Sequence, residues 1–129
     1  MFPLTNLNEV TIVLVEDHPD TRSFLTDFLT HRGARVIATG SAEDALQAIQ
    51  QHHPDVVLSD IGLPGRSGFD LLKDIHALGP EHRKVPVIAM TALGGIVQRE
   101  RAAAAGFQGL LRKPFDPDGL LKALQSVLR

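Results

Sequence analysis

Polar residues stand at the carboxyl ends of four short apolar runs, and this arrangement constrains the fold of the 129-residue chain more than any other feature. These residues are Glu16 with Asp17, Asp60, Thr91 and Lys113. If the runs are parallel strands, all of these positions project from one edge of one sheet, where open α/β sheets bind their ligands. Three carboxylates, a hydroxyl and an ammonium would then share a pocket suited to a divalent metal and a phosphoryl group.

The apolar runs alternate with helical patterns, which favours βα units around a parallel sheet. The predicted strands cover about residues 11–15, 35–38, 55–59, 86–90 and 109–112. The predicted helices cover about residues 20–32, a segment that Ser41 caps and that runs to about residue 52, a segment capped by Ser67, residues 96–105, and a last segment with Asp116 as cap and Pro117 at its first position. Right-handed crossovers then predict a doubly wound sheet with strand order 2-1-3-4-5.

Some local features are predicted as well. In the helix at about 20–32, we expect Phe24, Leu25, Phe28 and Leu29 to share the buried face. Gly94 and Gly95 are expected to loosen the start of the helix at 96–105.

Five βα units without a linker leave no room for a second domain. We therefore expect residues 1–129 to form a single domain, with a core from about residue 10 to residue 128 and no output domain.

Composition excludes several classes of function. A net charge of −2 argues against direct binding of nucleic acid, which usually needs a basic patch. The chain contains no apolar stretch long enough to span a membrane. It also contains no cysteine, which excludes disulfides and thiolate metal sites and agrees with a cytoplasmic location.

The three carboxylates predict a magnesium site, because Mg²⁺ prefers oxygen ligands. Asp17 and Asp60 can each supply a carboxylate oxygen, and Glu16 can reach the ion directly or through water. The backbone carbonyl of Gly62 can complete the ligands from the protein. The alternative is that Glu16 and Asp17 merely cap the first helix, but Asp60 at the neighbouring strand end weakens that interpretation.

Asp60 is the candidate nucleophile, because a carboxylate can attack a phosphoryl group and form an aspartyl phosphate. A role for Asp60 as a helix cap is weak, since the next helix is capped later, at Ser67. Thr91 can donate a hydrogen bond to a phosphoryl oxygen, and Lys113 carries a compact charge suited to phosphate. We predict a cis Lys113–Pro114 bond that turns the ammonium into the pocket.

The six histidines do not form a set of metal ligands in the sequence. His18 follows the acidic pair directly, and we expect its ring to point away from the pocket along the start of the first helix.

These residues lie in motifs that resemble those of receiver domains of two-component response regulators, in particular stand-alone chemotaxis-type regulators. The motifs cover residues 13–17, 54–60, 63–65, 90–92 and 113–115, in the order and spacing of the family. The resemblance extends from about residue 10 to residue 128 and implies a flavodoxin-like (βα)5 fold with a five-stranded parallel sheet.

The resemblance implies a phosphoacceptor switch in which Asp60 accepts the phosphoryl group, Glu16 and Asp17 hold Mg²⁺, Thr91 is the switch hydroxyl and Lys113 contacts the phosphate. The donor would be a sensor histidine kinase or a histidine phosphotransfer protein. The chain would catalyse only its own phosphorylation and dephosphorylation.

The resemblance also implies an output face formed by the helix at 96–105, the strand at 109–112 and the last helix. That face would change on phosphorylation and act on a downstream protein target. Whether two copies pair through the same face stays open.

One position departs from the family, which usually has an aromatic switch residue three positions before the lysine. Leu110 stands there in this chain. A leucine can fill or vacate a cavity but has no hydroxyl, so we predict a muted or differently coupled output face.

Other interpretations remain at this stage. The chain could be a receiver from a hybrid histidine kinase or from a larger regulator. A magnesium-dependent phosphohydrolase typically needs a second aspartate two residues after the nucleophile, where this chain has Gly62. A flavin carrier of the same fold needs a phosphate-binding loop after the first strand, where Glu16 and Asp17 would repel phosphate.

Overall fold

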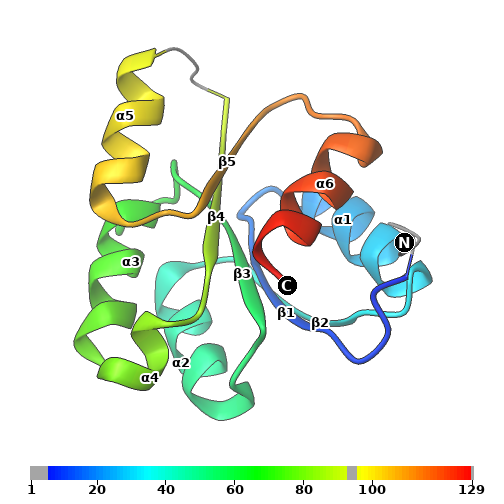
Figure 1. Cartoon of the computed structure of the whole chain (residues 1–129), viewed down its shortest axis with the longest axis horizontal. Helices are drawn as coiled ribbons and strands as arrows, with labels where there is room; N and C mark the ends of the chain where they lie inside the picture. Colours follow the sequence, from blue (N-terminus) through cyan, green and yellow to red (C-terminus); the bar gives the residue numbers. More distant parts are fainter. Residues whose placement is uncertain (1–5, 93–95, 129) are drawn as a thin grey trace.

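Five parallel strands form one sheet in the computed structural model, which describes residues 6–92 and 96–128 (Figure 1). The strands are β1 (Thr11–Val15), β2 (Arg35–Thr39), β3 (Val56–Asp60), β4 (Val87–Thr91) and β5 (Gly109–Arg112). Their order, β2-β1-β3-β4-β5, confirms the predicted doubly wound topology.

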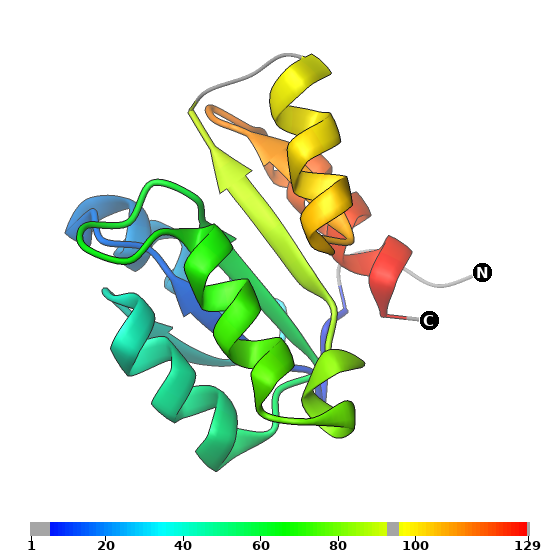
Figure 2. The same cartoon turned by 90° about the vertical axis from the view of Figure 1, so that its left-hand side faces the viewer.

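Helices cover both faces of the sheet (Figures 1 and 2). They are α1 (Pro19–His31), α2 (Ala42–His52), α3 (Gly68–Ala77), α4 (Pro80–Arg83), α5 (Ile96–Ala105) and α6 (Pro117–Val127). Helices α1 and α6 pack on one face, and α2, α3 and α5 pack on the other. Within the described part of the chain, no helix has both the length and the apolar character needed to cross a membrane.

Alternating strand residues divide the core between the two faces. Val13 and Val57 belong to the cluster beneath α2, α3 and α5, whereas Leu14 and Leu58 belong to the cluster beneath α1 and α6. All five residues of β3 are buried, which is expected of a central strand covered on both sides. The sheet edge that carries the polar residues is therefore held by a core that packs tightly on both faces.

Side-chain caps set the starts of three helices. Ser67 and Asp70 form a full capping box at α3, in which each side chain bonds the other residue's backbone N–H. The hydrogen bond from the Ser67 backbone lowers the pKa of Asp70 below its ordinary value. Ser41 caps α2 and Asp116 caps α6, as their sequence positions predict.

The structure corrects two of the predictions. Phe24 is 60% exposed and stacks on Phe28, so it does not belong to the buried face of α1, which contains Leu25 and Leu29. The single-turn helix α4 is absent from the prediction, because one turn is too short to show an apolar period.

Small differences also appear at the element ends. The third and fourth strands each end one residue later than predicted, at Asp60 and Thr91. Gly94 and Gly95, which were expected to loosen the start of α5, lie outside the described residues.

We predict that Phe24→Ala and Leu25→Ala have very different effects on stability, although the two residues are neighbours. Leu25 is 1% exposed, so its truncation leaves a cavity and lowers the free energy of unfolding by about 2–5 kcal/mol. Phe24→Ala removes an exposed stacking contact and costs less than about 1 kcal/mol. Urea unfolding followed by circular dichroism measures both, because the chain has no Trp or Tyr. Equal losses would show that Phe24 contributes to the core.

Candidate functional site

The polar residues meet because the ends of four strands lie in register. Val15 of β1 pairs with Ser59 of β3, so Glu16 and Asp60 are neighbours. Asp60 pairs with Met90 of β4, next to Thr91. Thr91 in turn pairs with Arg112 of β5, the residue before Lys113. The prediction that these strand ends share one edge of the sheet is confirmed.

Lys113 joins two of the carboxylates. Its Nζ lies 2.5 Å from Oε1 of Glu16 and 3.0 Å from Oδ2 of Asp60. The Glu16 side chain is fully buried, and that of Asp60 is 12% exposed. The Lys113–Pro114 bond is cis and the ammonium points into the site, as predicted.

Backbone amides bind the other oxygen of each of these carboxylates. Gly62 donates its N–H to Oδ1 of Asp60 at 3.0 Å, and His18 donates its N–H to Oε2 of Glu16 at 3.1 Å. Both oxygens of Glu16 are therefore occupied, one by Lys113 and one by His18. In the part of the chain that the structure describes, the Asp17 side chain accepts no hydrogen bond.

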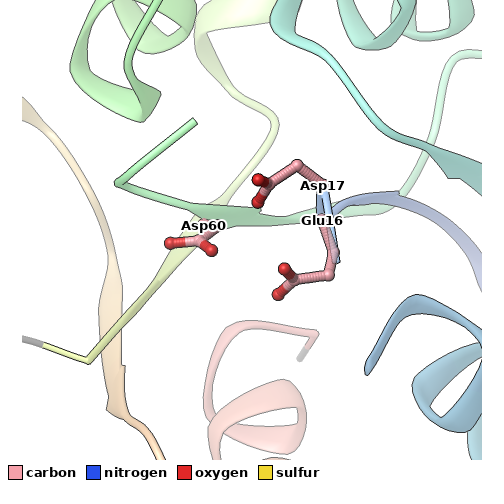
Figure 3. A group of neighbouring side chains, drawn as sticks. All are labelled: Glu16, Asp17 and Asp60. Carbon is pink, nitrogen blue, oxygen red and sulfur yellow. The ribbon is translucent and has the colours of Figure 1, made fainter. Parts of the chain in front are cut away.

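The three carboxylates form a candidate metal site. One oxygen each from Glu16, Asp17 and Asp60 lies within 4.8 Å of the others, and Figure 3 shows the three groups gathered at the ends of β1 and β3. All three donors are hard oxygen ligands, which suit Mg²⁺. The single positive charge of Lys113 does not balance three negative charges, which also favours a divalent cation at this place.

A cleft of about 470 Å³ opens above these residues. The residues that line it are Asp17, His18, Thr21, Asp60, Ile61, Gly62, Thr91, Ala92 and Lys113. Thr91 is buried, with 3% of its surface exposed, and it contributes to the wall of the cleft from the end of β4. The cleft therefore leaves space for a small group beside Asp60 and Lys113.

Two residues that the sequence interpretation did not place in the site line the cleft. One is His18, and the expectation that its ring points away along the start of α1 stays a prediction. Thr21, in the first turn of α1, was not predicted at all. It lies at the start of the helix that follows β1 and the acidic pair.

Lys113 keeps its charge within this setting. Burial by itself lowers the pKa of Lys113, but hydrogen bonds and attraction to Glu16 and Asp60 outweigh that effect. The net result is a pKa above the ordinary value of 10.5. The ammonium therefore remains a donor to anionic groups throughout the neutral pH range.

Leu110 lies on β5, away from the carboxylates. It is partly buried, pairs in register with Ala89 of β4 and packs on the core cluster beneath α5. A second hollow of about 200 Å³ lies beside it, between β5 and α5. Its lining residues are Arg99, Ala102, Ala103, Phe107, Gln108, Gly109 and Leu110.

Comparisons with known proteins agree with this geometry. The family model of the response regulator receiver domain matches residues 12–125. An uncharacterized 14.6 kDa protein of Leptolyngbya boryana is 34% identical over 122 residues, which cover 95% of this chain and 92% of that protein. The chain is also similar in structure to chemotaxis protein CheY4 of Vibrio cholerae, with a TM-score of 0.87 and 28% identity over 92% of this chain and 98% of that one.

Other relatives are longer. The two-component response regulator PhoP of Pseudomonas aeruginosa is 33% identical over 92% of this chain, which spans 51% of PhoP. The sensor histidine kinase RcsC of Escherichia coli is 32% identical over 91% of this chain, which spans only 12% of RcsC. The chain therefore spans nearly the whole of one relative, but only 51% of PhoP and 12% of RcsC.

We predict that Lys113→Met lowers the free energy of unfolding by about 3 kcal/mol in metal-free buffer at neutral pH, because it leaves the buried Glu16 without a counter-charge. The raised pKa of Lys113 fixes the pH dependence of this loss. Stability from the ion pairs is fully present below pH 10.5 and disappears as the pH rises through the higher value of the folded state.

Urea unfolding of the wild type and of Lys113→Met from pH 7 to pH 12 checks this prediction. The two proteins are expected to differ at neutral pH and to converge at the alkaline end. A difference that stays constant up to pH 12 would contradict it.

Proposed function

The chain belongs to the family of response regulator receiver domains, and we propose that it is a phosphoacceptor switch in which Asp60 takes a phosphoryl group from a phosphohistidine. The observation that carries the proposal is the environment of Asp60. Asp60 lines an open cleft, and its carboxylate lies 3.0 Å from the Lys113 ammonium and within 4.8 Å of two further acidic groups.

The transfer is a substitution at phosphorus. A carboxylate oxygen of Asp60 attacks the phosphorus atom, so that a new P–O bond forms while the P–N bond to the donor imidazole breaks. The leaving imidazole keeps the electron pair of the broken bond and takes up a proton from solvent. Lys113 stabilises the negative charge on the phosphoryl oxygens, because its ammonium is already held beside Asp60.

The carboxylates would hold Mg²⁺ with unequal roles. Asp17 and Asp60, with the backbone carbonyl of Gly62, would bind the ion directly. Glu16 would act through water and as the counter-charge of Lys113, because both of its oxygens already accept hydrogen bonds. When bound, the ion would neutralise charge on the phosphoryl oxygens.

Thr91 would connect phosphorylation to the surface. Its hydroxyl would bond a phosphoryl oxygen from the wall of the cleft. A shift of Thr91 at the end of β4 would pass to β5, because the two strands are paired up to Thr91 and Arg112. The outer face formed by α5, β5 and α6 would then change its affinity for a downstream protein.

The partners follow from this chemistry. The donor would be a sensor histidine kinase or a histidine phosphotransfer protein, and the downstream target would be a protein. Direct nucleic acid binding is not expected at a net charge of −2. Pairing of two copies through α5, β5 and α6, and a cytoplasmic location, stay predictions.

Two settings suit the same switch. It can work as a small regulator, since the Leptolyngbya boryana relative has nearly the same extent. It can also work as a receiver in a hybrid kinase or a larger regulator, since RcsC and PhoP contain similar segments. A phosphohydrolase is disfavoured, because Gly62 stands where a second catalytic aspartate would be needed. In either setting the chain would catalyse only its own phosphorylation and dephosphorylation.

We predict a metal-dependent adduct on Asp60. Incubation with phosphoramidate and Mg²⁺ should add one phosphoryl group to the wild type, stable to acid and labile to base, as intact mass spectrometry detects. Asp60→Asn should show none, because the amide lacks the nucleophilic carboxylate. The same experiment without Mg²⁺ is the control for metal dependence.

An adduct that hydrolyses quickly could escape detection by mass spectrometry. A second measurement therefore uses beryllofluoride as a stable mimic of the phosphoryl group, and NMR detects the bound state. No adduct and no beryllofluoride response in the wild type would contradict the proposal.

We predict that Leu110 mutes the output face. On addition of beryllofluoride, amide shift changes in α5, β5 and α6 should be larger in Leu110→Tyr than in the wild type. The hollow beside Leu110 offers space for an aromatic ring that can follow Thr91. Equal shift changes in the two proteins would contradict a muted response.

A further inference from the structure

Asp17 differs from the other two carboxylates in how it is held. Glu16 and Asp60 each have both oxygens in hydrogen bonds, to Lys113 and to backbone amides. Among the described residues, no donor holds the carboxylate of Asp17. The backbone fixes the direction of its Cα–Cβ bond, so the contacts that hold this backbone determine which positions the carboxylate can reach.

Arg22 fixes the backbone on both sides of Asp17. From the first turns of α1, its Nη1 donates to the carbonyl oxygen of Glu16 at 2.9 Å and reaches the carbonyl oxygen of Asp17 at 3.5 Å. These two carbonyls belong to the peptide planes before and after the Asp17 Cα. One guanidinium nitrogen therefore restrains both planes that determine where the Asp17 side chain points.

Further backbone contacts act on the same segment. The N–H of Glu16 bonds the carbonyl of Thr39 at the end of β2, at 3.0 Å. The N–H of His18 bonds the Glu16 side chain. The His18 N–H and the Asp17 carbonyl belong to the same peptide plane, so the plane after the Asp17 Cα is held by Glu16 as well as by Arg22. The plane before the Asp17 Cα is held through the Glu16 carbonyl, which accepts the shorter of the two hydrogen bonds from Arg22.

Gly40 provides the space in which the guanidinium lies. A Cβ atom at Gly40 would stand 2.9 Å from Nη1 of Arg22 and 4.0 Å from the carbonyl oxygen of Glu16. Gly40 does not have a positive φ, so its backbone conformation is open to alanine. Gly33 differs, because its φ of 101° disfavours any residue with a side chain. The atom it would displace is the far end of a flexible side chain, which can move without unfolding the protein.

We infer that Arg22 is a positioning residue for the metal site, which fixes the Asp17 carboxylate through the flanking carbonyls, and that the absence of a side chain at Gly40 is what lets Arg22 do so. The inference rests on the proposed function, since it concerns the Mg²⁺ site of the switch. It adds a link between the loop after β2 and the metal site that passes through neither Lys113 nor Thr91.

The direction of the change in Mg²⁺ affinity on substitution of Arg22 distinguishes a positioning role from an effect of its charge. The Arg22 guanidinium is a cation close to a cation site, so the loss of its charge alone would strengthen Mg²⁺ binding. Loss of the backbone contacts instead leaves Asp17 free to point elsewhere and weakens Mg²⁺ binding. Substitution of a residue that orients metal ligands typically weakens metal affinity by about 10- to 100-fold.

The experiment is a Mg²⁺ titration of the ¹⁵N-labelled protein, followed by amide shifts in NMR spectra. Arg22→Met and Gly40→Ala should each bind Mg²⁺ about tenfold more weakly than the wild type. The double variant should be no weaker than Arg22→Met, because both changes break the same contacts, whereas independent effects would multiply. In the metal-free spectra, the amide signals of Asp17 and His18 should shift in both single variants.

Arg32→Met is the matched control. Arg32 lies at the other end of α1, with its guanidinium over the Phe28 ring at 4.7 Å. Its substitution removes the same charge and the same type of side chain, and it should change the urea midpoint without changing Mg²⁺ affinity.

Each outcome is decisive. Wild-type Mg²⁺ affinity, or tighter binding, in folded Arg22→Met would overturn the inference and leave the proposed function intact. Multiplying effects in the double variant would overturn the role of Gly40. A wild-type protein that binds no Mg²⁺ and forms no Asp60 adduct would remove the proposed function itself.

Discussion

Parallel strand pairing is the constraint on which the rest of this molecule depends. Residues from distant parts of the chain become neighbours only because β1, β3, β4 and β5 end at the same level, with Val15 opposite Ser59 and Thr91 opposite Arg112. A shift of one residue in any pair would move a functional side chain to the opposite face of the sheet. The buried core on both sides of the sheet holds that register. The geometry of the site therefore depends on the packing of the apolar residues.

Charge balance explains why the site tolerates burial. Glu16 is completely buried, which is costly for a carboxylate unless it is paired and hydrogen-bonded. Lys113 supplies the counter-charge and the His18 amide satisfies the other oxygen, so the buried group has partners in the absence of metal. In the described part of the chain, the Asp17 carboxylate has no such partner. We infer that its orientation depends instead on the hydrogen bonds that Arg22 donates to the backbone carbonyls beside it.

Much of the fold followed from local pattern. Apolar runs located all five strands, and caps such as Ser67 and Asp116 located helix starts, because period and capping chemistry are properties of neighbouring residues. Phe24 shows the limit of this reasoning. Four apolar residues fitted one face of α1, but only the packing of α1 on the sheet decides how wide the buried stripe is, and Phe24 falls outside it.

The sequence by itself determined the composition of the site and its place at the strand ends, because residue type and strand position are both local. It could not show that both oxygens of Glu16 are occupied, that the His18 backbone N–H bonds the Glu16 side chain, or that Arg22 lies against the carbonyls beside Asp17. Those facts were decided by the tertiary structure. Hydrogen bonds between side chains and distant backbone depend on the docking of α1 and the loop after β2, and nothing in residue spacing encodes that docking.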